Sequence, residues 1–195
     1  MMTANEYKIL ACFFPKLKPL IAKILEKQTK LTHEPVYRTL KKLVKEKILS
    51  VKKIGQTNIY EINKSNEFFY QIFIHYASEK RLAFKAKHDL LYKRIYEFLN
   101  EIQPQEFTIL FGSYAKGKET PRSDIDLLVV ATNRERIKTI AKTYKTKYNL
   151  VFSVIVITPN DFENIKKDNM VFWEDLVNYG IIFDGLDYFF RRVYR

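Results

Sequence analysis

Four residues in the second half of the chain have types and spacing that suit the binding of a phosphate and a metal ion. Gly112-Ser113 follows an apolar run, and Asp124 and Asp126 open another one after an interval of ten residues. A glycine lets a phosphate approach the backbone closely, and Ser113 adds an N–H and a hydroxyl. Side chains two apart on a strand share one face, so the carboxylates repel each other unless a cation lies between them. Such oxygen ligands suit Mg²⁺ or Mn²⁺.

Positive charge lies in the same loop, because Lys116, Lys118 and Arg122 separate the glycine-serine pair from the carboxylates. A helix that begins at Ser113 would turn its free N–H groups toward the same anion. Each motif alone also has an ordinary explanation. A glycine-serine pair is common in strand-to-helix turns, and carboxylates often end a strand in water.

The two motifs together are more specific than either alone. Gly112-Ser113, ten residues, Asp124-x-Asp126 and then four aliphatic residues resemble the minimal nucleotidyltransferases of the DNA polymerase-β superfamily. The resemblance implies transfer of a nucleoside monophosphate from an NTP, with ATP expected, to a protein or RNA hydroxyl, as in antitoxins that modify a partner toxin. It also implies the roles of the residues: metal binding and catalysis for Asp124 and Asp126, phosphate binding for Gly112 and Ser113, and neutralisation of the triphosphate by Lys116 with Lys118 or Arg122.

One part of the family's site is missing from the sequence. The family usually carries a third carboxylate on the next strand, which here is predicted over residues 150–157. The expected position falls on Ser153 or Ile155, and neither is an acid. The first alternative to a nucleotide-transferring enzyme is therefore a transcriptional regulator whose degenerate domain binds a nucleotide without turnover. A dimerisation module without ligands is disfavoured by the retained motifs.

The positive charge of the chain is concentrated near its N-terminus. The protein has 195 residues and a net charge of +12, and residues 1–63 contain 13 Lys and Arg against 5 Asp and Glu. Residues 64–105 contain 7 against 5, and residues 106–195 contain 14 against 12. This distribution favours a polyanionic partner for the first part of the chain. A lysine bias that only aids solubility is the alternative.

The order of elements in the basic part predicts a winged helix-turn-helix. Helices are expected over residues 4–13 and 16–28, and a third is expected after an N-cap at Thr32, with Pro35 in its first turn. Two short strands around a turn at residues 55–58 follow. Residues 36–43 and 52–55 resemble the recognition helix and the wing of that family. The resemblance implies DNA binding, with protein contacts as the alternative. The expected DNA-binding residues are Tyr37, Arg38, Lys41, Lys52 and Lys53.

Three segments are predicted from these patterns. They are a winged helix-turn-helix at 1–63, a helical connector with a homodimer contact at 64–103, and a nucleotidyltransferase domain at 104–195. In the last segment, strands near 107–111, 124–130 and 150–157 alternate with helices at 133–147 and 170–179, and a short strand is expected at 181–183. This alternation predicts an α+β or α/β fold with a small mixed sheet.

Composition excludes several classes of protein. The single cysteine, Cys12, excludes an intramolecular disulfide framework and a zinc site of several cysteines. No run approaches the roughly 20 apolar residues that a membrane span needs. Glu6 and Lys8 interrupt any signal-peptide pattern at the N-terminus. A cytoplasmic protein without a membrane partner is therefore expected.

Overall fold

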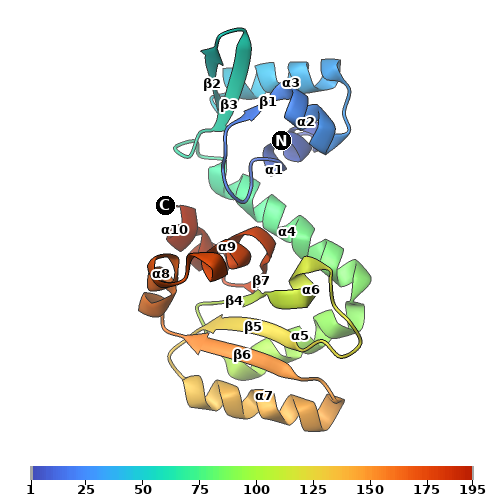
Figure 1. The fold of residues 1–195 in the computed structure, drawn as a ribbon, viewed down its shortest axis with the longest axis vertical. Coiled ribbons are helices and arrows are strands. Elements are labelled where there is room, and N and C mark those ends of the chain that lie inside the picture. The colour runs from blue at the N-terminus through green and yellow to red at the C-terminus, as the bar shows by residue number, and fades with distance from the viewer. Residues whose placement is uncertain (1, 195) are drawn as a thin grey trace. The chain divides into compact units, whose positions relative to one another are not determined.

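The computed structural model describes residues 2–194, which form two compact units. The N-terminal unit ends at Tyr76 and the C-terminal unit begins at Ala77. The boundary falls inside one helix, α4 (Phe69–Lys87), which contributes residues to both units (Figure 1). The mixture of helices with small sheets confirms the predicted α+β class.

The N-terminal unit contains three helices and a small antiparallel sheet before α4. The sheet has the order β1-β3-β2, with Leu20 opposite Tyr60 and Leu49 opposite Ile62. Its core is formed by one buried face from each helix, including Leu25 and Leu40. The elements in chain order are α1 (Ala4–Ala11), β1 (Leu20–Ile21), α2 (Ala22–Thr29), α3 (His33–Lys45), β2 (Leu49–Ile54) and β3 (Thr57–Ile62).

The structure corrects the helix expected over residues 16–28. Leu20-Ile21 forms a short strand, and α2 begins only at Ala22. The apolar spacing that suggested one helix is real, but Pro19 lacks the N–H that a helix interior requires. The two residues after Pro19 gain backbone hydrogen bonds by pairing with Ile59 and Tyr60, which lie far away in the sequence.

A buried carboxylate ties α1 to α3. Glu6 is 3% exposed and accepts hydrogen bonds from the Lys42 ammonium at 2.7 Å and from the Thr3 N–H at 2.9 Å. Burial raises the pKa of Glu6, but the hydrogen bonds from Lys42 and Thr3 outweigh it, so the pKa lies below its ordinary value. The stabilisation that Glu6 provides is therefore complete above the ordinary carboxyl pKa and is lost as the pH falls through the lowered one.

We expect Glu6→Gln to lower the free energy of unfolding at neutral pH by about 1–3 kcal/mol, since it leaves a weaker partner for Lys42 in a buried position. The loss of stability on acidification should become shallower in this variant. Urea unfolding of the full chain between pH 3 and pH 7 measures both effects. Glu34→Gln is the matched control, because Glu34 pairs with Arg38 at 3.6 Å on the exposed surface, where an ion pair contributes little to stability. Equal effects of both substitutions would contradict the assigned role of Glu6.

The C-terminal unit is built on a four-stranded sheet of order β6-β5-β4-β7. β5 and β6 are parallel, and β4 is antiparallel to both of its neighbours. After α4, the elements in chain order are α5 (Asp89–Ile102), β4 (Phe107–Leu110), α6 (Gly112–Lys116), β5 (Ile125–Val130), α7 (Arg134–Tyr148), β6 (Phe152–Ile157), α8 (Pro159–Asp168), α9 (Met170–Tyr179), β7 (Ile181–Asp184) and α10 (Leu186–Tyr194).

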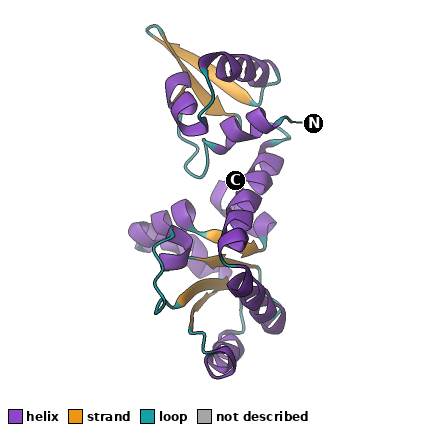
Figure 2. Ribbon diagram, turned by 90° about the vertical axis from the view of Figure 1, so that its right-hand side faces the viewer, coloured by secondary structure: helices purple, strands orange, loops and turns teal. Residues whose placement is uncertain are grey.

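Helices lie on both sides of this sheet (Figure 2). On one side, α5 and α7 pack through Phe98 and Tyr144 against alternate residues of β5 such as Leu127. On the other side, Phe107 of β4 contacts Phe162 of α8 and Phe189 of α10. The helix α10 was not predicted. These two layers hold the ends of β4, β5 and β6 in a fixed arrangement.

The predicted connector at 64–103 contains two helices, α4 and α5. Its second helix, α5, buries Ile95, Phe98, Leu99 and Ile102 in the core of the C-terminal unit. The three predicted segment boundaries and the homodimer contact stay predictions. Within residues 2–194, no helix combines the length and the apolar character needed to cross a bilayer.

Candidate functional site

The predicted glycine and one predicted carboxylate lie against each other. Gly112 has a φ of +69°, and a Cβ atom added to it would lie 2.0 Å from the Oδ2 atom of Asp126. Just before Gly112, the N–H of Phe111 donates a hydrogen bond to the carbonyl oxygen of Asp126 at 2.9 Å. Only glycine combines this left-handed backbone with so close an approach. The sequence motif therefore corresponds to a packed contact between the end of β4 and the start of β5.

Of the two residues expected at the third-carboxylate position, Ser153 lies beside Asp126. The parallel register of β5 and β6 places Ser153 opposite Asp126, whereas Ile155 lies opposite Leu128. Burial raises the pKa of Asp126, a hydrogen bond from the Ser153 hydroxyl opposes that effect, and the nearby Asp124 adds to it. Of the two alternatives left open by the sequence, the register favours Ser153.

The donor set fits a magnesium ion bound with a nucleotide. Asp126 is half-buried and Asp124 is exposed directly before β5. Mg²⁺ usually keeps several waters and takes one or two protein carboxylates together with substrate phosphates, so two carboxylates are sufficient. The raised pKa of Asp126 reflects a carboxylate that a cation would stabilise. Within residues 2–194 there is no group of three or more His, Cys, Asp or Glu side chains that could hold a metal ion.

The cations predicted to bind phosphate have different surroundings. The Lys116 ammonium lies 2.6 Å from the Asp175 carboxylate and 5.5 Å from the centre of the Tyr179 ring, both in α9. Lys118 and Arg122 are exposed in the loop that follows α6. The sequence reasoning did not identify Asp175, because no local signal relates a residue of α9 to α6. Lys116 is therefore paired with Asp175 in this structure.

The loop between α6 and Asp124 has its own anchor. Glu119 accepts a hydrogen bond from the Lys87 ammonium at 2.6 Å, and that bond lowers the pKa of Glu119. The second oxygen of Glu119 is buried without a hydrogen-bond partner in the described residues. The N–H of Lys118 also donates to the Ser113 carbonyl at 2.9 Å. The sequence reasoning missed this anchor, which joins the end of α4 to the loop that positions Asp124.

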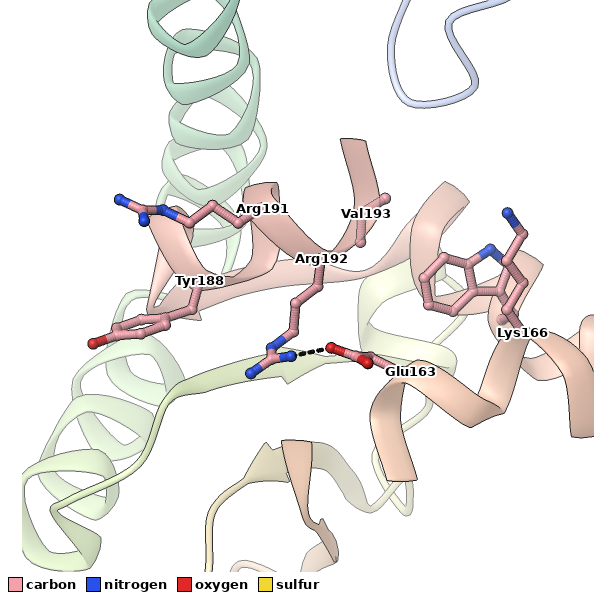
Figure 3. A pocket seen from close by; sticks show the side chains of 7 residues that line it. Glu163, Lys166, Tyr188, Arg191, Arg192 and Val193 are labelled. Atoms are coloured by element: carbon pink, nitrogen blue, oxygen red, sulfur yellow. Dashed lines mark hydrogen bonds and ion pairs between the residues drawn. The ribbon is translucent and has the colours of Figure 1, made fainter. Parts of the chain in front are cut away.

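Two cavities of the C-terminal unit lie outside this constellation. One, of about 610 Å³, is lined by residues of α8, α9 and α10, and Arg192 points toward Glu163 across it (Figure 3). Arg192 also contacts Glu106, next to the start of β4 and away from Gly112. The other, of about 490 Å³, is lined by residues that include Tyr114, Tyr148 and Leu150. Neither cavity is lined by the carboxylates or by the predicted cations.

The residues predicted to bind DNA lie on the surface of the N-terminal unit. Arg38 and Lys41 are exposed on α3, and Tyr37 on the same helix is 53% exposed. Lys52 and Lys53 are exposed on β2. The opposite face of α3 is buried and includes Val36 and Leu40. The amphipathic pattern of α3 therefore leaves its basic side open to solvent.

Comparison with known proteins identifies the family of the segment that contains this site. A model described as "Nucleotidyltransferase domain" matches residues 92–177, a segment that contains Gly112, Ser113, Asp124, Asp126 and Ser153. Three relatives from Methanocaldococcus jannaschii are 33–34% identical to the chain over the matched segments. The chain belongs to the nucleotidyltransferase domain family. Membership implies an NTP substrate and a divalent metal in general terms.

The relatives of this chain are provisionally named protein adenylyltransferases. MJ1305 is 34% identical over 84 residues, which cover 39% of this chain and 56% of the relative. MJ0141 and MJ0604 are each 33% identical over 37% and 45% of this chain and over 73% and 92% of their own lengths. The chain thus spans little more than half of MJ1305. No solved structure gave a significant match.

Proposed function

We propose that the C-terminal unit transfers AMP from ATP to a protein hydroxyl. The observation that carries the proposal is the contact between Gly112 and the Asp126 carboxylate at the joined ends of β4 and β5. It supports a site in which a phosphate can approach the backbone beside a metal-binding carboxylate. The names of the relatives support a protein as acceptor and AMP as the group transferred.

Each residue of the constellation has a role in this proposal. Asp124 and Asp126 would hold Mg²⁺, which neutralises charge on the phosphates when bound. The backbone at Gly112 and Ser113 holds the terminal phosphates. Lys116 reduces the remaining negative charge of the triphosphate, and Asp175 keeps the Lys116 side chain near α6. The acceptor oxygen forms a bond to the α-phosphorus, the bond to the bridging oxygen breaks, and pyrophosphate leaves with that electron pair. The hydroxyl proton passes to water.

A second candidate function is favoured by one observation. Ser153 stands opposite Asp126, where an additional acid would bind the metal that activates the acceptor. A serine hydroxyl is a weaker metal ligand and a weaker base than a carboxylate. This supports slow transfer, or nucleotide binding without turnover by a regulator.

An assay with labelled nucleotide distinguishes the transferase from the regulator. The full chain is incubated with Mg²⁺, with protein extract as acceptor, and with ATP, GTP, CTP or UTP labelled on the α-phosphate. Protein-bound label from ATP that disappears in Asp124→Ala would support the transferase. ATP binding measured by titration, without label on any acceptor, would reject the transferase and leave the regulator.

For the N-terminal unit we propose a winged helix that binds DNA. The order α1-β1-α2-α3-β2-β3 with a three-stranded antiparallel sheet supports this assignment. The exposed basic side of α3 supports its entry into the major groove, and the exposed lysines of β2 support contacts to phosphates. The concentration of +8 within residues 1–63 agrees with a polyanionic partner.

We expect Lys52→Ala combined with Lys53→Ala to weaken DNA binding at all sequences alike. Each lost phosphate contact should reduce the slope of log affinity against log salt by about 0.9. Arg38→Ala with Lys41→Ala should instead reduce the preference for the protein's own upstream DNA. Fluorescence anisotropy at several salt concentrations measures both quantities. Lys64→Ala serves as the control, because Lys64 lies just beyond β3. Unchanged salt slopes in all variants would reject the DNA proposal.

A further inference from the structure

Exposed apolar side chains lie beside the carboxylates along β6 and at the start of α9. Val151 and Ile155 are each 40% exposed, and Met170 and Val171 are 52% and 83% exposed. Single exposed apolar residues are normal on a protein surface, whereas groups of them beside a site often mark a binding surface. These four residues are called the apolar rim below. Their positions relative to Asp126 follow from the sheet register and from one aromatic contact.

The first half of the apolar rim belongs to β6 and the residue before it. The register pairs Asp126 with Ser153 and Leu128 with Ile155, and paired residues of neighbouring strands share a face. Val151, Ser153 and Ile155 alternate along the chain and therefore lie on the face that carries the Asp126 carboxylate. Within the described sheet β6 is an outermost strand, so these side chains lie at the edge of the sheet.

The second half of the apolar rim begins α9. Phe172 packs edge-on against Phe111 with ring centres 5.4 Å apart. The N–H of Phe111 in turn donates to the carbonyl oxygen of Asp126. Met170 and Val171 directly precede Phe172, so they lie at the end of α9 that packs on Phe111.

We propose that the apolar rim docks the acceptor protein beside its reacting hydroxyl. The proposal rests on the function proposed above and specifies the acceptor as a protein segment whose hydroxyl residue has apolar neighbours. The hydroxyl oxygen takes the AMP from ATP, pyrophosphate leaves with the bond's electron pair, and the proton passes to water. The rim residues of β6 and those of α9 would both contact this segment.

The charges around the site favour a protein over an RNA acceptor. An RNA acceptor needs several cations along its backbone. The rim carries no charge, Lys116 is already paired with Asp175, and Lys118 and Arg122 are the other cations of the neighbouring loop. Residues 106–195 as a whole hold 14 Lys and Arg against 12 Asp and Glu. A surface with an apolar centre and few charges is instead typical of contacts between proteins.

Defined acceptors test the proposal. The probes are a peptide with one tyrosine and one serine among leucines, the same peptide with lysines in place of the leucines, and an oligoadenylate RNA. Each is incubated with the full chain, Mg²⁺ and ATP labelled on the α-phosphate. We expect the leucine peptide to be labelled roughly tenfold faster than the lysine peptide, since burial of an aliphatic side chain is worth about that factor. The RNA should remain unlabelled.

Substitutions in the apolar rim test whether the faster labelling of the leucine peptide depends on the rim. Ile155→Ser and Val171→Ser should each slow labelling of the leucine peptide several-fold, with unchanged affinity for ATP measured by titration. Leu90→Ser is the matched control, because Leu90 is 67% exposed on α5 and lies outside the rim. Thermal melting checks that each variant is folded. If Ile155→Ser unfolds, Val171→Ser still tests the proposal, because Val171 is more exposed than Ile155.

Each result has a distinct meaning. Equal labelling of both peptides, labelling of the RNA, or full rates in both rim variants would overturn the docking proposal while leaving nucleotide transfer intact. ATP binding without labelling of any probe would overturn transfer together with docking. Absence of ATP binding by the wild-type chain would overturn the nucleotide site itself.

Discussion

Gly112→Ala should lower the rate of nucleotide transfer at least about 10²-fold. The added methyl group would lie 2.0 Å from the Oδ2 atom and 2.9 Å from the Cγ atom of Asp126, so the carboxylate must move. A displacement of about 1 Å in a reacting site costs on the order of 10²-fold in rate. Initial rates with labelled ATP measure the loss, and titration with ATP and Mg²⁺ shows whether binding falls with it.

The chain contains a matched control for backbone strain. Gly117 has a φ of +65°, close to that of Gly112, but a Cβ atom added there meets nothing within 4 Å. Gly117→Ala should therefore destabilise the fold by about 1–2 kcal/mol through the left-handed backbone and leave the transfer rate nearly unchanged. Equal loss of activity in both variants would show that strain near α6, and not the contact with Asp126, accounts for the effect.

Ser153→Asp should raise the transfer rate by roughly 10²-fold, because a carboxylate at this position would help to hold a metal ion that activates the acceptor oxygen. The substitution places a carboxylate opposite Asp126 in the adjacent parallel strand, where the hydroxyl now donates to Asp126. Without a metal the extra negative charge should lower the melting temperature, because three carboxylates then repel one another. Addition of Mg²⁺ should recover more stability in this variant than in the wild type.

Ser153→Asn separates charge from size. Asparagine matches aspartate in shape but lacks the charge, so this variant should show neither a faster rate nor a larger response of the melting temperature to Mg²⁺. A Ser153→Asp protein that binds Mg²⁺ more tightly without any gain in transfer would favour the regulator over the enzyme. Melting curves at several Mg²⁺ concentrations and initial rates together decide between the two.

The sequence predicted those parts of the fold that depend on local patterns. The amphipathic stripe of α3 and the aliphatic run of β5 both agree with the structure. The strand at Leu20-Ile21 was missed because only its pairing with Ile59 and Tyr60 makes it a strand. The helix α10 was missed because its apolar residues, such as Phe189, are buried by packing against β4 and α8, which lie elsewhere in the sequence.

The same distinction holds for the site. The sequence predicted that Gly112-Ser113 and the two carboxylates belong to one site, whereas the contact of Gly112 with Asp126 depends on the antiparallel pairing of β4 with β5. Two alternatives for the missing acid could not be separated until the register of β6 was known. The pairing of Lys116 with Asp175 could not be predicted, since it depends on where α9 packs.

The place of β7 in the sheet has a practical consequence for dissecting this protein. The family match ends at residue 177, yet β7 pairs with β4, the strand that leads into Gly112. Lys80 and Arg81 also donate hydrogen bonds to the carbonyls of Gly180 and Phe183. A gene fragment cut at the limits of homology would leave β4 with an open edge and should yield aggregating material. Catalytically useful fragments need α4 at one end and β7 at the other.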